Sequence, residues 1–105
     1  MIDRNLFSFY VAGFTYYDGI DVISELRIGT TLKLVAEPEN KFDPYAVAVY
    51  YEETKLGFIP SKENKIISQF LQLGYDSLFE TRINRVSIDS HPEQQVGAIL
   101  RILNK

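Results

Sequence analysis

The sequence predicts a small, mainly β domain: an antiparallel β-barrel of about six short strands with one main helix near residues 61–73. Alternating apolar and polar residues recur in short runs that Pro, Gly, Asn and Asp separate, which is typical of strands and turns. Helical spacing is pronounced in one late window only, and strands with one inserted helix favour a barrel that closes its own edges. A chain of 105 residues with 46% hydrophobic side chains can form one packed core, so we expect a single domain over 1–105.

The first half of the chain contains two expected strands. The first shows strand alternation at Phe7, Phe9 and Val11, whose neighbours are smaller or more polar. The spacing of the apolar residues in 20–28 indicates a short helical turn, which Gly29 ends. The next strand is predicted over 31–37.

The second half contains the remaining strands. The segments 46–51 and 56–59 are expected to form a hairpin around a loop at 52–55. The last two strands are predicted over 78–88 and 96–103. Within 78–88 the apolar residues change face midway, and a β-bulge would restore the alternation.

The main helix is expected to begin after Pro60, with Ser61 as its N-cap, because a serine hydroxyl accepts an unpaired backbone N–H. Gly74 stands where a left-handed C-terminal residue belongs. We expect Phe70 to be buried, as part of an apolar stripe that packs on the core. That stripe consists of Ile66, Ile67, Phe70, Leu71 and Leu73.

Composition excludes several classes of function. The chain has no cysteine and one histidine, His91, so disulfides, thiolate sites and multi-histidine metal sites are excluded. The acids Glu37, Glu39 and Asp43 share one turn, where acidic residues are usually solvated. No nucleophile–base pair or phosphate-binding glycine loop is found, so we expect neither a cofactor nor an enzyme.

Charge and hydropathy limit location and partners. The net charge is −3, whereas a protein that coats duplex DNA is normally basic. A small site that reads one or two nucleotides remains compatible with this charge. Neither a signal peptide nor an apolar run of about 20 residues is found, so we expect a cytoplasmic protein with no membrane contact.

Three motifs follow one another along the chain: GFTYYDG at 13–19, EPENKFDPYAVAV at 37–49 and LGFIP at 56–60. Together they resemble the HIRAN domain family, over about residues 9–73. The middle motif is the most specific, because many of its positions are constrained. The resemblance implies an OB-like or SH3-like barrel with an added helix. It also implies a module that binds the 3′ end of single-stranded DNA, in relatives that stand alone or are fused to helicase-like repair enzymes.

The resemblance assigns roles residue by residue. Tyr16 would stack on a terminal base and Tyr17 would lie near a phosphate. Phe42 would provide the second stacking surface. Asp43 would accept a hydrogen bond from the 3′-hydroxyl, and Asn40 would lie beside the DNA backbone.

Two cations of the family pattern are missing, which would weaken binding. Thr15 stands where the family's DNA binders carry arginine, and Phe58 stands where they carry a basic residue or histidine. A further phosphate-contacting lysine aligns near Ser61, next to Lys62, which is therefore the candidate cation. The alternative is a protein-interaction or regulatory barrel that has lost DNA binding, with a helicase-like or repair protein among its possible partners.

A structural role for the same loop is open beside the binding role. Asn and Asp side chains often organise turns through bonds to nearby backbone, so we expect Asn40 and Asp43 each to bond backbone within 37–46. If the chain binds 3′ ends, Tyr16 and Phe42 should lie across a shallow pocket with Asp43 at its floor.

Overall fold

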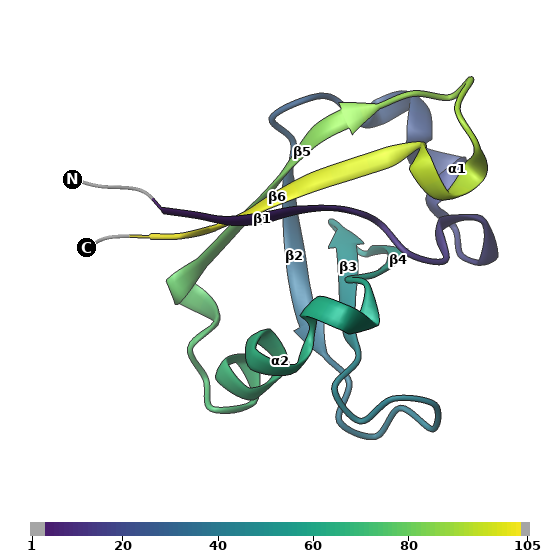
Figure 1. Cartoon of the computed structure of the whole chain (residues 1–105). Helices are drawn as coiled ribbons and strands as arrows, with labels where there is room; N and C mark the ends of the chain where they lie inside the picture. Colours follow the sequence, from purple (N-terminus) through teal and green to yellow (C-terminus); the bar gives the residue numbers. More distant parts are fainter. Residues whose placement is uncertain (1–3, 104–105) are drawn as a thin grey trace.

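The structure, a computed structural model, describes residues 4–103 and contains a six-stranded antiparallel sheet curved into a barrel (Figure 1). The order of the strands across the sheet is β1-β6-β5-β2-β3-β4. The strands are β1 (Arg4–Tyr10), β2 (Thr31–Ala36), β3 (Val47–Tyr51), β4 (Thr54–Phe58), β5 (Phe79–Val86) and β6 (Val96–Ile102). The predicted fold class is confirmed.

The barrel closes where the chain leaves β1. Ala12 donates its N–H to the carbonyl of Phe58 at 2.8 Å and accepts the N–H of Phe58 at 2.9 Å. This pair joins the continuation of β1 to β4, which are the two outermost strands of the sheet order. At this point the backbone groups of Ala12 and Phe58, which an open edge would expose, are paired.

Bulges in the strands control which residues face outward. The register of β5 against β6 shifts between Ile83 and Arg85, which confirms the bulge predicted in this strand. The register of β3 against β4 also shifts, between Val49 and Tyr50, so that β4 has one extra residue at this point. The hairpin between β3 and β4 is tighter than expected, because β4 already begins at Thr54.

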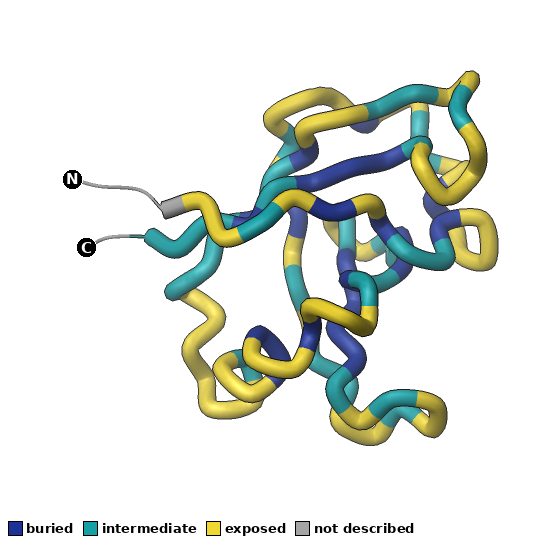
Figure 2. The backbone as a smooth tube through the Cα atoms, viewed as in Figure 1, coloured by how far each residue is buried: buried dark blue, intermediate teal, exposed yellow. Residues whose placement is uncertain are grey.

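The core lies inside the barrel and consists mainly of branched aliphatic side chains. Phe9 and Val11 are buried, as the alternation in β1 predicted. Figure 2 shows buried backbone in the first half of β6 and of β3, whereas the loop between β2 and β3 consists mainly of exposed and intermediate residues. The largest fully buried side chains include Phe14, Leu26, Leu56, Ile59, Ile83 and Leu100.

Helical segments cover the ends of the barrel. The main helix is α2 (Lys65–Gln72), and α1 (Gly19–Val22) follows β1. The 3₁₀ turns are η1 (Phe14–Tyr16), η2 (Ile23–Glu25), η3 (Ser61–Glu63), η4 (Asp76–Leu78) and η5 (Pro92–Gln94). In the part of the chain that the structure describes, no helix is long and apolar enough to cross a membrane.

The prediction that Ser61 caps the main helix was wrong. Ser61 begins the 3₁₀ turn η3, and α2 begins four residues later with Asn64 as its N-cap. The side chain of Asn64 donates to Asp43 at 2.8 Å. This bond ties the residue before α2 to a distant loop, a contact that local sequence signals cannot show.

The expectation that the whole apolar stripe of α2 packs on the core was also wrong. Ile67 is buried, but Ile66 and Leu73 are exposed and Phe70 is 39% exposed. The helix rests on the barrel rim along a narrow line, where the Phe70 ring meets Tyr75 and Phe79 edge to face.

The end of α2 follows the prediction. Gly74 is left-handed, with φ 89°. Its N–H and that of Tyr75 bond the carbonyls of Leu71 and Phe70, both at 3.0 Å. This is the Schellman arrangement, with the Phe70–Tyr75 contact as its apolar partner.

Candidate functional site

The loop between β2 and β3 is held in shape by its own side chains. The N–H of Glu37 bonds the carbonyl of Ala46 at 2.8 Å and closes the loop. The side-chain oxygen of Asn40 accepts the N–H groups of Phe42 and Asp43 at 2.8 and 3.1 Å. Phe42, whose backbone is held in this way, is 97% exposed.

Asp43 connects this loop to the start of α2. Its Oδ1 accepts the N–H of Tyr45 at 2.8 Å, and its Oδ2 accepts Nδ2 of Asn64 at 2.8 Å. The predicted bonds of Asn40 and Asp43 to backbone within 37–46 are therefore confirmed. Asn64 is 3% exposed, so its amide holds the carboxylate from a fixed position. Each carboxylate oxygen can accept a second bond, which leaves acceptor capacity for a ligand.

A hollow of about 290 Å³ lies at the point where the barrel closes, and we call it the closure hollow. Its walls come from the loop, from the β1–β4 closing pair and from the segment before α2. Its lining residues are Ala12, Tyr17, Asn40, Phe42, Asp43, Ala46, Phe58, Ile59, Ser61 and Asn64.

The structure brings together four of the six predicted DNA-binding residues: Tyr17, Asn40, Phe42 and Asp43 line the closure hollow. Tyr16 and Lys62 are not among its lining residues. Tyr17, and not Tyr16, therefore lines the hollow together with Phe42, and Tyr16 is 83% exposed. The DNA contacts predicted for Tyr16 and Lys62 stay predictions.

A lysine that sequence reasoning missed lies behind one wall of the hollow. The ammonium of Lys55 is 4.4 Å from the ring centroid of Phe58 and 4.9 Å from that of Tyr17. The two rings meet edge to face, with centroids 5.5 Å apart. The extra residue in β4 places Lys55 on the same face as Phe58, whereas strict alternation would place them on opposite faces.

Lys55 forms an ion pair with Glu37, 2.7 Å away. Partial burial acts to raise the pKa of Glu37, but the hydrogen bonds from Lys55 and Asn40 and the ammonium charge outweigh it. The pKa of Glu37 is therefore lowered from its ordinary value of 4.5. The pair ties the base of the loop to β4.

The lowered pKa of Glu37 predicts a pH dependence of stability. A carboxyl with a depressed folded-state pKa stabilises the protein above the unfolded-state value, and this contribution is lost as the pH falls through the folded-state pKa. Between about pH 5 and pH 3, the free energy of unfolding should fall less steeply for Glu37→Gln than for the wild type. Urea unfolding across this range measures the slope.

Glu39→Gln is the matched control, because Glu39 is an exposed acid of the same loop. Its slope should match that of the wild type. Equal slopes for Glu37→Gln and the wild type would contradict the predicted role of the Glu37–Lys55 pair.

Within residues 4–103, no group of three or more acidic or histidine side chains could hold a metal ion. Two of the three acids of the loop, Glu37 and Asp43, are instead engaged in bonds to protein groups. The closure hollow thus combines exposed aromatic rings with one oriented carboxylate.

Comparison with known proteins identifies the family. The model of the HIRAN domain matches residues 5–102. The chain belongs to the HIRAN family. The resemblance carried by the three sequence motifs is therefore confirmed, and the six-stranded barrel is an OB-like HIRAN fold.

Two solved structures share this HIRAN fold. A protein from Lactobacillus plantarum has 21% identity and a TM-score of 0.80, over 99% of this chain and 98% of that chain. The HIRAN domain of human HLTF has 14% identity and a TM-score of 0.64, over 95% of this chain and 76% of that chain. No curated protein matches the chain.

Proposed function

We propose that this HIRAN domain binds nucleic acid, and that its ligand is the 3′ end of single-stranded DNA held in the closure hollow. One observation carries the proposal: an oriented carboxylate, Asp43, lies in a hollow with the aromatic rings of Tyr17 and Phe42. Membership of the HIRAN family supports the choice of ligand.

The chemistry of the hollow suits a strand end. Aromatic rings stack on bases whatever their sequence, at about 1–3 kcal/mol per base. The carboxylate of Asp43 can accept a hydrogen bond from a free hydroxyl, and it repels a phosphate at the same place. Since Tyr45 and Asn64 each occupy one acceptor position, the carboxylate is oriented before the ligand arrives.

The cations near the hollow are few but well placed. Lys62 is exposed in η3, next to the lining residue Ser61, whereas Lys55, held against Tyr17 and Phe58, is already paired with Glu37. Such a site contacts one or two phosphates, so a net charge of −3 does not oppose it strongly. We infer weak binding that depends modestly on salt.

Titration of the protein with two short oligonucleotides, identical except for a 3′-hydroxyl or a 3′-phosphate, tests the proposal. We expect tighter binding of the hydroxyl end, and Asp43→Asn should reduce that preference because it removes the repulsive charge. The amide keeps one acceptor oxygen for the N–H of Tyr45, but its NH2 group faces the Asn64 amide, which must turn its own oxygen toward it. Circular dichroism melting of the variant therefore checks that the loop is intact. Equal affinity for both ends would contradict end recognition, and no binding of either would contradict the function.

Thr15→Arg supplies a gain-of-function arm of the same titration. Thr15 is exposed in η1, beside the aromatic pair. An added arginine should strengthen binding and steepen its salt dependence by about one unit, because one more phosphate is neutralised. Binding that stays undetectable at low salt would exclude the closure hollow as a nucleic-acid site.

A protein-interaction module is the second candidate function. It is favoured by the acidic net charge and by two exposed apolar side chains, Ile66 in α2 and Leu73 just after it. It is the function that remains if neither oligonucleotide binds. A helicase-like or repair protein as partner, a cytoplasmic location and the lack of catalytic activity stay predictions.

A further inference from the structure

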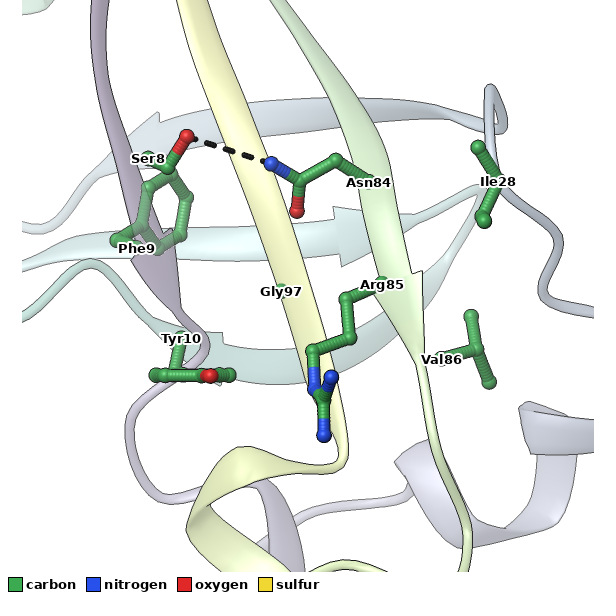
Figure 3. Close-up of a pocket in the computed structure, with 8 residues that line it drawn as sticks. All are labelled: Ser8, Phe9, Tyr10, Ile28, Asn84, Arg85, Val86 and Gly97. Carbon is green, nitrogen blue, oxygen red and sulfur yellow. Dashed lines mark hydrogen bonds between the residues drawn. The ribbon is translucent and has the colours of Figure 1, made fainter.

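A second hollow, of about 540 Å³, lies on the outer face of the sheet, on strands β1, β6 and β5. It centres on one row of residues across these strands, because Gly97 pairs with Tyr10 on one side and with Arg85 on the other. Figure 3 shows Tyr10 and Arg85 beside β6 at Gly97. The lining residues are Ser8, Phe9, Tyr10, Ile28, Asn84, Arg85, Val86 and Gly97.

The hollow exists because position 97 has no side chain. A Cβ there would lie 3.1 Å from Oδ1 of Asn84 and 3.2 Å from Cβ of Arg85. The bulge in β5 puts Asn84 and Arg85 in succession on the exposed surface, where regular alternation would turn one of them inward. Two local features of the sequence thus combine to open one depression between a ring and a guanidinium group.

The Arg85 side chain is positioned by neutral partners. Its Nε donates to the carbonyl of Gln94 at 3.3 Å and one terminal nitrogen donates to Oγ of Ser90 at 2.9 Å. Its guanidinium carbon lies 6.0 Å from the ring centroid of Tyr10. Among residues 4–103, no carboxylate pairs with it. A fixed, unneutralised arginine with N–H groups to spare is suited to a phosphate.

The other groups of this hollow suit a nucleotide base. Tyr10 is 42% exposed although it lies within a strand, and an exposed ring stacks on any base. The amide of Asn84, held by a bond to Oγ of Ser8 at 3.3 Å, adds polar edges beside the ring.

Residues close together along the chain line the two hollows. Tyr10 lines the outer hollow and Ala12 lines the closure hollow. Two residues along an extended strand span about 7 Å, which is a short step for a nucleic-acid backbone. A single strand of DNA whose 3′ end lies in the closure hollow can therefore continue over Tyr10.

We propose that Tyr10, Asn84 and Arg85 form a second nucleotide subsite, which binds a base on Tyr10 and a phosphate on Arg85 farther along the same single strand. The proposal rests on the function proposed for the closure hollow, and it extends the binding surface onto β1, β6 and β5. It predicts that affinity increases with strand length beyond the terminal nucleotides.

The test compares a dinucleotide and a decanucleotide, both with a free 3′-hydroxyl, by fluorescence anisotropy at low salt. The wild type should bind the decanucleotide more tightly. Tyr10→Ala and Arg85→Gln should each weaken decanucleotide binding about 5-fold or more and leave dinucleotide binding unchanged. Arg85→Gln should also lower the salt slope for the decanucleotide by about one unit.

Conservative variants separate recognition from folding. Tyr10→Phe keeps the ring and should retain affinity. Lys33→Gln removes one charge from an exposed position of β2 that lines neither hollow, and it should leave both affinities unchanged. Circular dichroism melting of each variant checks that the barrel is intact.

The outcomes distinguish the two proposals. Wild-type decanucleotide affinity in folded Tyr10→Ala and Arg85→Gln would overturn the second subsite alone. If these variants lose binding while Phe42→Ala does not, the subsite is supported and the function proposed for the closure hollow is overturned. Absence of binding of either oligonucleotide to the wild type would overturn both.

Discussion

Gly57→Ala should lower the free energy of unfolding by about 2–5 kcal/mol, because backbone strain and steric overlap act together. Gly57 has φ 151°, a conformation that L-residues with a side chain rarely adopt. An added Cβ would lie 2.2 Å from the carbonyl oxygen of Ala12 and 2.8 Å from Cγ1 of Val11. A domain of this size has about 5–15 kcal/mol of total stability, so the variant could lose much of it.

The overlap falls on the pair that closes the barrel. The carbonyl oxygen of Ala12 accepts the N–H of Phe58 at 2.9 Å, and a methyl group at position 57 would force these strands apart. Ala12 and Phe58 also line the closure hollow, so Gly57→Ala should change the shape of the candidate site. Urea unfolding followed by circular dichroism measures the loss.

Gly74→Ala is the matched control for backbone strain without overlap. Gly74 has φ 89°, and a Cβ there would meet nothing within 4 Å. Its cost should be about 1–2 kcal/mol, the ordinary penalty for a left-handed residue with a side chain. A cost for Gly57→Ala no larger than this would contradict the close approach of β4 to Ala12.

Local chemistry explains which features of the fold the sequence predicted. Alternation located the strands, and the change of face within 78–88 correctly indicated the bulge in β5. The bonds of Asn40 and Asp43 were predictable because Asx side chains bond backbone within a few residues. Each of these signals acts over a short stretch of chain.

The errors come from contacts between distant segments. α2 begins after Asn64, whose side chain bonds the distant Asp43, although the sequence around Ser61 has good capping residues. Phe70 has helical spacing with the buried Ile67, yet Phe70 is 39% exposed. The apolar stripe of α2 is therefore wider than the part of the helix that the barrel covers. Spacing along a helix gives the direction of a side chain and not the size of the surface opposite it.

In the candidate site, too, local signals were correct and contacts between distant segments were missed. The paired aromatics indicated a binding surface, but adjacent positions gave no means of deciding which ring faces the hollow. Gly13, with φ 73°, turns the chain into η1, and after this turn Tyr17 lies against Phe58. Lys55 was missed because the sequence placed it in the loop at 52–55, whereas β4 begins at Thr54 and its extra residue puts Lys55 on the face of Phe58.

Phe42→Ala should weaken binding of a 3′-hydroxyl oligonucleotide by about 1–3 kcal/mol, or about 5- to 150-fold, because one stacking surface is removed. The ring is 97% exposed, so its loss should leave the melting temperature unchanged. Phe42→Tyr keeps an aromatic surface and should retain affinity. Such a separation of affinity from stability would distinguish a binding residue from a packing residue.

A parallel pair of variants determines which tyrosine faces Phe42 in solution. Tyr17 lines the closure hollow and Tyr16 does not, so Tyr17→Ala should weaken binding more than Tyr16→Ala. Since Tyr17 also contacts Phe58 and Lys55, the melting temperature of the Tyr17→Ala variant should fall slightly. Binding is therefore compared well below the melting temperatures of both variants. A larger loss for Tyr16→Ala would mean that the bound strand stacks outside the hollow. Unchanged affinity in Phe42→Ala would mean that the loop does not hold a base.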